Sequence, residues 1–326
     1  MQAVGNVHMK LSVRILLGCI LLAACTNATA SPGTQPSKPP TATPVPSATS
    51  RLTNTPLPTH TPTPKPTEIP CEHPTGLMVA TTYPGDVVRE PIDVRIFLPP
   101  CYESSGINYP TLYLLHGKPY DESHWDDLGA DELAGEAMQN GDWPPFIIVM
   151  PFAPDILFSG TDGGSWSYEE EVVEGLVPWV DQNYRTIADP QWRGFAGISR
   201  GGVWVLEIAL LHPDLFDSIA ALSPALAMNM ARPHYDPFEL AFRGTGVPQR
   251  ILLIAGETDW ARGETERFSQ TLDSLRIPHE LIIVPGDHQD ETWQQAMEEV
   301  LTFFVDAWGG DIQSMLGTPT PMPTMN

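Results

Sequence analysis

Residues 194–202 read Gly-Phe-Ala-Gly-Ile-Ser-Arg-Gly-Gly, and this stretch decides the fold. The apolar run Gly194–Ile198 leads into Ser199, and the apolar, helix-like segment Gly202–Leu211 follows directly. The glycines leave room for a strained turn from a buried strand to a helix, which pushes the serine hydroxyl out at the carboxyl edge of a sheet. The helix N-terminus behind the serine favours developing negative charge. The stretch therefore predicts a nucleophilic serine mounted on an α/β sheet.

Short apolar runs alternate with amphipathic segments along the rest of the domain. The first two runs alternate residue by residue and should form an antiparallel pair, whereas the later, almost continuously apolar runs are typical of a parallel sheet buried on both faces. A strand followed by a helix, repeated, indicates crossover units, so we expect a mostly parallel, doubly wound α/β sheet with helices on both faces. The predicted strands are Leu77–Tyr83, Val87–Leu98, Thr111–Leu115, Phe146–Met150, Gly194–Ile198, Ser218–Leu222, Ile251–Ala255 and Leu281–Val284. The predicted helices are Leu128–Gln139, Glu169–Tyr184, Gly202–Leu211, Glu264–Leu275 and Thr292–Ala307.

Two later strand ends offer the partners that a nucleophilic serine needs. A serine hydroxyl is a poor nucleophile unless a histidine takes its proton and a carboxylate orients that histidine. Asp259 and His288 each follow a predicted strand, in the order serine, acid, histidine that this kind of sheet uses. We therefore expect Ser199, Asp259 and His288 to meet at the carboxyl edge of the sheet.

Other carboxylates near these strand ends are weaker candidates. Glu257 precedes Asp259 by two residues and is an alternative acid. Asp287 and Asp290 are too close in sequence to His288 to orient its ring, so we expect both to face solvent.

An acyl-transfer site also needs hydrogen-bond donors aimed at the oxyanion. The amide of Arg200, directly after the serine, supplies one. The second should come from the turn after the strand over 111–115, where residues 116–119 read His-Gly-Lys-Pro. Because proline has no N–H, the Lys118 amide is the candidate. The Lys118 side chain either points into solvent or contacts an anionic substrate.

Two segments are expected to border the site. The loop Pro151–Ser167 follows a strand end and should overhang the serine, and the insert Ala227–Arg243 is a candidate cap. Trp125, Trp166 and Trp260 are candidates for an aromatic wall that binds an acyl or sugar group, with core packing as the alternative.

Three stretches of the chain resemble one enzyme family. They are Tyr109–Gly117 (Tyr-Pro-Thr-Leu-Tyr-Leu-Leu-His-Gly), the turn Gly197–Gly202, and Gly286-Asp287-His288 with Trp293. They resemble the esterase family of α/β-hydrolases that includes S-formylglutathione hydrolase, enterochelin esterase, feruloyl and acetyl-xylan esterases, and the mycolyltransferases. The resemblance covers about residues 77–307.

The resemblance implies an α/β-hydrolase fold and a serine esterase that needs no metal or organic cofactor. It supports Ser199, Asp259 and His288 as the triad. We expect hydrolysis, through an acyl-enzyme, of an ester outside the cytoplasm, such as an acylated carbohydrate, a siderophore ester or a small ester; an acyltransferase and a non-catalytic surface binding protein are the alternatives. The chain departs from many relatives in carrying Lys118-Pro119 where they have more glycine.

The composition argues against two classes of partner. The chain has 40 Asp and Glu against 17 Lys and Arg, a net charge of −23. Proteins that bind nucleic acid present a basic face, and adhesion to an anionic membrane needs a polybasic patch. We expect no nucleic-acid partner, and a small-molecule or polysaccharide ester as the substrate.

The N-terminal residues are typical of a secretion signal. Lys10 and Arg14 precede the apolar run Ile15–Ala24, which is too short to span a bilayer but suits the apolar core of a signal peptide. Small residues before Cys25 resemble the lipobox of bacterial lipoproteins. We therefore expect a signal peptide over 1–25 and lipid anchoring at Cys25 on the cell surface, with an ordinary secretory signal as the alternative.

The remaining chain divides by composition. Residues 26–70 are rich in Pro and Thr and should be a disordered linker, 71–309 should form one domain, and 310–326 should be a disordered tail. Outside the cytoplasm, Cys71 and Cys101 are expected to form a disulfide, with two reduced thiols as the alternative. Neither cysteine lies near a histidine pair at ligand spacing, so we expect no metal site.

Overall fold

The computed structural model describes residues 70–244 and 246–316. The predicted signal peptide, Cys25, the linker up to residue 69 and residues 317–326 lie outside the described residues. Within the described residues, no helix combines the length and the apolar character that crossing a membrane requires.

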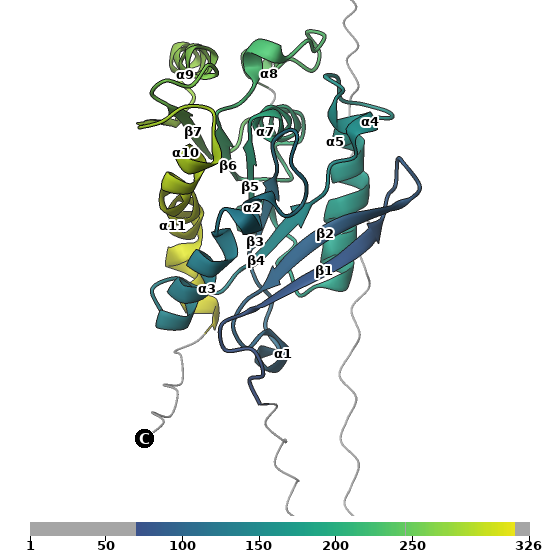
Figure 1. Ribbon diagram of the computed structural model, residues 1–326, viewed down its shortest axis with the longest axis vertical. Coiled ribbons are helices and arrows are strands. Elements are labelled where there is room, and N and C mark those ends of the chain that lie inside the picture. The colour runs from purple at the N-terminus through teal and green to yellow at the C-terminus, as the bar shows by residue number, and fades with distance from the viewer. Residues whose placement is uncertain (1–69, 245, 317–326) are drawn as a thin grey trace, which may run out of the picture. The chain divides into compact units, whose positions relative to one another are not determined.

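Among the described residues, eight strands form a single sheet. Figure 1 shows how its strands and helices are arranged. The order across the sheet is β1-β2-β4-β3-β5-β6-β7-β8, with β1, β2 and β4 paired antiparallel and all later pairs parallel. This is the mostly parallel, doubly wound sheet that the sequence predicted. The strands are β1 (Leu77–Pro84), β2 (Pro91–Leu98), β3 (Thr111–Leu115), β4 (Ile147–Pro151), β5 (Arg193–Ile198), β6 (Ser218–Leu222), β7 (Arg250–Gly256) and β8 (Glu280–Val284).

Helices cover both faces of the sheet (Figure 1). The longer ones on one face are α6 and α7 with α9, and α3 and α11 cover the other. The helices are α1 (Tyr102–Ser105), α2 (His124–Asp127), α3 (Ala130–Asn140), α4 (Asp155–Phe158), α5 (Tyr168–Glu170), the π-helical η1 (Glu171–Leu176), α6 (Val177–Asn183), η2 (Pro190–Trp192), α7 (Arg200–Leu211), η3 (Leu226–Met228), α8 (Pro237–Arg243), α9 (Arg262–Leu275), α10 (Asp290–Gln295) and α11 (Met297–Leu316).

The pleat of the central strands explains why they read as continuous apolar runs. In β3, Tyr113 and Leu115 pack into the apolar cluster on one face, whereas Leu112 and Leu114 pack into the cluster on the other. Successive side chains of a strand point to opposite faces, so a strand with helices on both sides needs apolar residues at every position.

Most predicted boundaries are displaced by one or two residues, and three elements differ more from the sequence predictions. β2 begins at Pro91 rather than at residue 87, because the amide of Gly85 donates to the carbonyl of Glu90 and closes a turn there. The helix expected over 169–184 contains a π-helical segment, which precedes Pro178, a residue that lacks a helical donor. The single helix expected over 292–307 is two helices, α10 and α11, and α11 continues to Leu316.

The N-terminal edge of the domain is held by a disulfide. Cys71 is bonded to Cys101, as the sequence predicted, and the bridge closes a loop with a sequence separation of 30 residues. It fastens the segment before β1 to the end of β2, the strand next to it.

Candidate active site

The turn at Ser199 joins β5 to α7 in a strained conformation. Ser199 has φ +53° and ψ −110°, which residues other than glycine rarely adopt. The flanking glycines lie against backbone: a Cβ on Gly197 would come within 2.5 Å of the Gly201 carbonyl group, and a Cβ on Gly201 within 2.5 Å of the His116 carbonyl oxygen. The turn can therefore form only with bare backbone on both sides of the serine.

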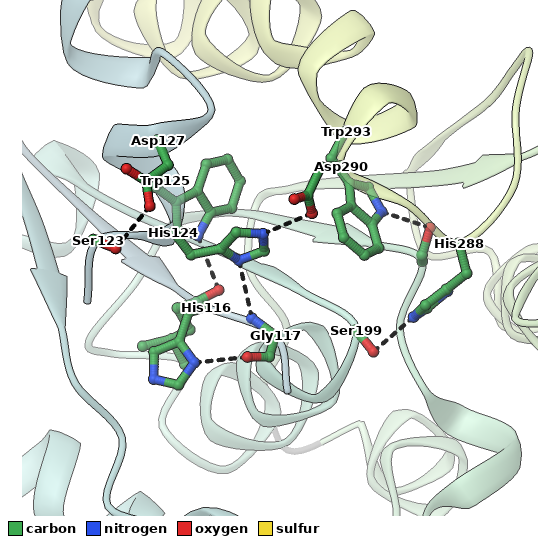
Figure 2. Close-up of polar contacts among 12 residues, drawn as sticks. His116, Gly117, Ser123, His124, Trp125, Asp127, Ser199, His288, Asp290 and Trp293 are labelled. Carbon is green, nitrogen blue, oxygen red and sulfur yellow. Dashed lines mark hydrogen bonds and ion pairs between the residues drawn. The ribbon is translucent and has the colours of Figure 1, made fainter. Parts of the chain in front are cut away.

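His288 lies between Ser199 and Asp259 in one chain of hydrogen bonds. Its Nε2 is 2.9 Å from the Ser199 hydroxyl oxygen (Figure 2), and its Nδ1 is 2.9 Å from Asp259 Oδ1. The three residues follow β5, β7 and β8, whose carboxyl ends share one edge of the sheet. In this arrangement the serine hydroxyl donates to Nε2, and the Nδ1–H group donates to the carboxylate.

Asp259 is almost fully buried, with 6% of its surface exposed. Burial opposes ionisation, but hydrogen bonds from His288 and from the Ala261 amide, 2.7 Å away, hold the pKa of Asp259 below its usual value. The carboxyl group is therefore ionised at neutral pH. Glu257, the alternative acid, is exposed. Asp259 is the carboxylate that contacts His288.

The turn after β3 lies directly against the serine. A Cβ on Gly117 would be 3.4 Å from the Ser199 Cβ, so the backbone of this turn packs against the nucleophile, and Lys118 is the next residue along it. The Lys118 side chain is exposed, as one of the two expectations had it, and there its ammonium group contacts the Ser159 hydroxyl and lies 2.9 Å from the Asp155 carboxylate. The lysine thus ties this turn to the overhanging loop.

The two segments expected to border the site contact each other. The loop Pro151–Ser167 contains α4, and the insert Ala227–Arg243 contains α8; both lie at the same end of the molecule (Figure 1). Arg232 Nε is 2.7 Å from Asp162 Oδ2, and this ion pair joins the insert to the loop. Their contact is consistent with a shared cover over the strand ends.

The three tryptophans proposed for an aromatic wall occupy different environments. Trp260 is 50% exposed, and its ring centroid is 4.4 Å from that of His288. Trp166 is 71% exposed on the overhanging loop. Trp125 is 1% exposed, and its indole N–H donates to the Leu115 carbonyl. The expectation for Trp125 is therefore corrected: it packs in the core.

Two histidines that the sequence reasoning left aside lie beside the site. His116 and His124 are each 2% exposed, and both contact Gly117 (Figure 2). Asp290 was expected to face solvent; its side chain is 46% exposed and also lies 3.2 Å from His124 Nε2. Their places in the sequence could have indicated them, because both histidines flank the turn that was predicted to supply an oxyanion donor.

One group of carboxylates within residues 70–244 and 246–316 has the spacing of metal ligands. Asp126, Asp131 and Glu132 place ligand atoms within 4.8 Å of one another. Burial, followed by the neighbouring carboxylates, raises the pKa of Asp131 to about 8. A cation at this cluster would compete with that proton and with Arg95, which is paired with Asp126.

A family model described as "Putative esterase" matches residues 86–304, a stretch that contains Ser199, Asp259 and His288. The chain belongs to this esterase family. Its membership agrees with the resemblance carried by the strand-turn-helix at the serine.

Curated relatives of this esterase include proteins from two bacteria. It is 27% identical over 220 residues to an esterase of Mycobacterium tuberculosis, an alignment that covers 63% of this chain and 45% of the relative. It is 33% identical over 197 residues to an endo-1,4-beta-xylanase/feruloyl esterase of Xylanibacter ruminicola, which covers 59% of this chain and 26% of the relative. The chain thus spans less than half the length of either relative.

Solved structures show the same fold. A ferulic acid esterase superposes with a TM-score of 0.64 at 22% identity, covering 71% of this chain and 98% of that one. An S-formylglutathione hydrolase of Staphylococcus aureus superposes with a TM-score of 0.61 at 19% identity, covering 71% and 99%. The predicted α/β-hydrolase fold is therefore confirmed.

Proposed function

We propose that this chain is a serine carboxyl-ester hydrolase that acts through an acyl-enzyme. The observation that carries the proposal is the chain of hydrogen bonds from Ser199 through His288 to Asp259. Ser199 Oγ attacks the ester carbonyl carbon while His288 Nε2 takes the hydroxyl proton, and ionised Asp259 stabilises the imidazolium. His288 then protonates the leaving alcohol, and water repeats the same steps to release the acid.

Two backbone amides serve the tetrahedral intermediate in this proposal. The Arg200 amide lies at the N-terminus of α7, and the Lys118 amide lies in the turn packed against the serine. Donors fixed in place before the reaction stabilise the charge that develops on the carbonyl oxygen, and each is typically worth about 10²–10³ in kcat.

The proposed substrate is an ester outside the cytoplasm: an acylated carbohydrate, a siderophore ester or a small ester. Exposed Trp260 beside His288 and exposed Trp166 on the overhanging loop supply apolar surface for an acyl group. The predicted signal peptide and lipid anchor at Cys25 support a location on the cell surface, and one relative is itself described as a xylanase and feruloyl esterase.

Hydrolysis of p-nitrophenyl esters from acetate to palmitate tests the proposal, with wild type compared with Ser199→Ala. We expect turnover that depends on Ser199, and the optimal chain length reports the depth of the acyl site. Absence of turnover with every ester, together with no labelling of Ser199 by a fluorophosphonate probe, would contradict it and favour a binding protein. Transfer of the acyl group to an added alcohol in preference to water would identify an acyltransferase.

A further inference from the structure

Two buried histidines hold Gly117 from opposite sides, and neither takes part in the proton transfers proposed above. The Gly117 amide donates to His124 Nδ1 at 3.4 Å, and the Gly117 carbonyl oxygen lies 2.8 Å from His116 Nδ1 (Figure 2). Gly117 packs against Ser199. Whatever fixes Gly117 therefore also fixes how the Lys118 amide approaches the nucleophile.

The hydrogen-bond partners assign a neutral tautomer to each ring. The Ala153 amide donates to His116 Nε2 at 2.9 Å, so the proton of His116 is on Nδ1 and is donated to the Gly117 carbonyl. His124 has the opposite tautomer: Nδ1 accepts from Gly117, and Nε2–H donates to Asp290 Oδ1 at 3.2 Å. Burial lowers the pKa of His116 to about 4 and also lowers the pKa of His124. These shifts favour the neutral rings that the contacts require.

The planar peptide between Gly117 and Lys118 carries this constraint to the oxyanion donor. The C=O and N–H groups of a trans peptide point in opposite directions. Because the C=O is held by His116, the Lys118 N–H points away from that ring. His124 holds the preceding peptide through the Gly117 N–H, so the two histidines together fix both sides of the turn.

His124 also connects this turn to the loop that carries the proposed general base. Asp290, its partner, follows His288 by two residues at the start of α10. Trp293 lies between the two rings, with centroids 5.8 Å from His124 and 5.1 Å from His288. Tyr120 stacks on His124 at 3.7 Å with parallel planes. The ring of His124 is thus held through its two nitrogens and by stacking.

We propose that His124, held by Asp290, is a positioning residue for the oxyanion hole. It accepts the Gly117 amide, keeps the Lys118 N–H aimed at the tetrahedral intermediate, and ties that donor to the loop of His288. This inference rests on the proposed function, because an oxyanion hole has a role only if Ser199 attacks an ester.

Four single variants separate this role from simple packing. His124→Phe keeps the ring volume and the stack on Tyr120 but removes both hydrogen bonds. His124→Asn keeps an acceptor, because its amide oxygen can take the place of Nδ1. Asp290→Ala removes the partner of Nε2, and Asp287→Ala, the matched control, removes an exposed carboxylate from the same loop.

The variants are compared by kcat and KM for p-nitrophenyl acetate and by inhibition with benzeneboronic acid, whose tetrahedral adduct on Ser199 places an oxygen in the oxyanion hole. His124→Phe should lower kcat about 10- to 100-fold, with KM within about twofold, because the lost interaction acts on the transition state. The affinity for the boronic acid should fall in parallel. His124→Asn should stay within about fivefold of wild type, Asp290→Ala should lose about three- to tenfold, and Asp287→Ala should match wild type.

Wild-type kcat and boronic acid affinity in His124→Phe would overturn the inference, as would equal losses in His124→Phe and His124→Asn. If circular dichroism shows that His124→Phe does not fold, the half-exposed Asp290 and its control Asp287 decide the question, and equal activity of their alanine variants overturns it. If the Ser199→Ala variant keeps the turnover of wild type, the proposed function is wrong, and this inference fails with it.

Discussion

Glu207 has a buried carboxyl group and lies in α7, the helix that begins directly after Ser199. It is 0% exposed, and burial raises its pKa to about 9 although the neighbouring Arg200 favours the ionised form. The folded protein therefore keeps this proton at pH 7, whereas the unfolded chain releases it near the ordinary value of 4.5. A group that is protonated only in the folded state makes stability depend on pH.

The sign of this dependence is a fall in stability as pH rises from about 5 to 9, because the folded state binds more protons than the unfolded state. The fall approaches ~1.4 kcal/mol per pH unit for one such group. Glu207→Gln cannot titrate, so its unfolding free energy should lack this component. Urea unfolding of both proteins at pH 5, 7 and 9 measures the difference; equal pH slopes would show that Glu207 is not protonated in the fold.

The strand-turn-helix unit formed by β5, Ser199 and α7 tolerates no side chain on its inner surface. A Cβ on Gly201 would lie 2.5 Å from the His116 carbonyl oxygen and 2.7 Å from that of Leu115, and neither backbone group can rotate away. We expect Gly201→Ala to displace the helix from the turn after β3, to cost roughly 1–3 kcal/mol, and to lower esterase activity at least about tenfold.

Gly263→Ala, in the first turn of α9, is the matched control for this change. A Cβ there has no atom within 4 Å, so the same added methyl group should be neutral or should stabilise by up to about 1 kcal/mol. Thermal unfolding and p-nitrophenyl acetate hydrolysis of the two variants provide the comparison. Equal behaviour would mean that the turn accommodates a side chain.

The disulfide links the segment before β1 to the end of β2. Replacing both Cys71 and Cys101 with serine should lower the unfolding free energy by about 3–4 kcal/mol, because a closed loop of this length restricts the unfolded chain. Urea unfolding measures the loss, and wild type treated with a reductant should lose the same amount. The folded variant should keep its esterase activity, since neither cysteine lies at the strand ends that carry Ser199.

At the scale of the whole molecule, the net charge of −23 sets up a field that repels anions. Salt shortens the reach of this field to about 8–10 Å near physiological ionic strength. We expect kcat/KM for a negatively charged ester, p-nitrophenyl hemisuccinate, to rise by roughly two- to tenfold between 10 mM and 0.5 M NaCl, whereas p-nitrophenyl acetate should respond little. An equal response of the two esters would show that the net charge does not govern substrate approach.

The sheet and the proposed triad could be predicted because both depend on signals local in sequence. β3 and β6 have their predicted bounds, since a strand buried on both faces is apolar at every position. Ser199, Asp259 and His288 could be proposed, and their hydrogen-bonded contact anticipated, because each closely follows such a run. For these three residues, a place in the sequence directly after a strand was enough to predict a place at the carboxyl edge of the sheet.

The surroundings of the triad could not be predicted in the same way. His124 and Asp290 are 166 residues apart in sequence, so only the folded sheet brings them together. Trp125 follows the turn after β3, where an aromatic residue suits either a core or a binding wall, and its burial is decided by neighbours on other elements. The sequence also left the side chain of Lys118 open, because its partners belong to a different loop.

The order of the site residues along the chain determines when, during folding, the site is complete. Ser199 precedes His288 by 89 residues, and β8, the strand that leads to His288, is the last strand of the sheet. A partly folded protein in which the strands up to β6 have assembled presents the strained serine without a base, and such a hydroxyl is nearly inert. On the proposed mechanism, turnover therefore requires the final strand and its loop, and turnover recovered on refolding would report the completion of the domain rather than the formation of its core.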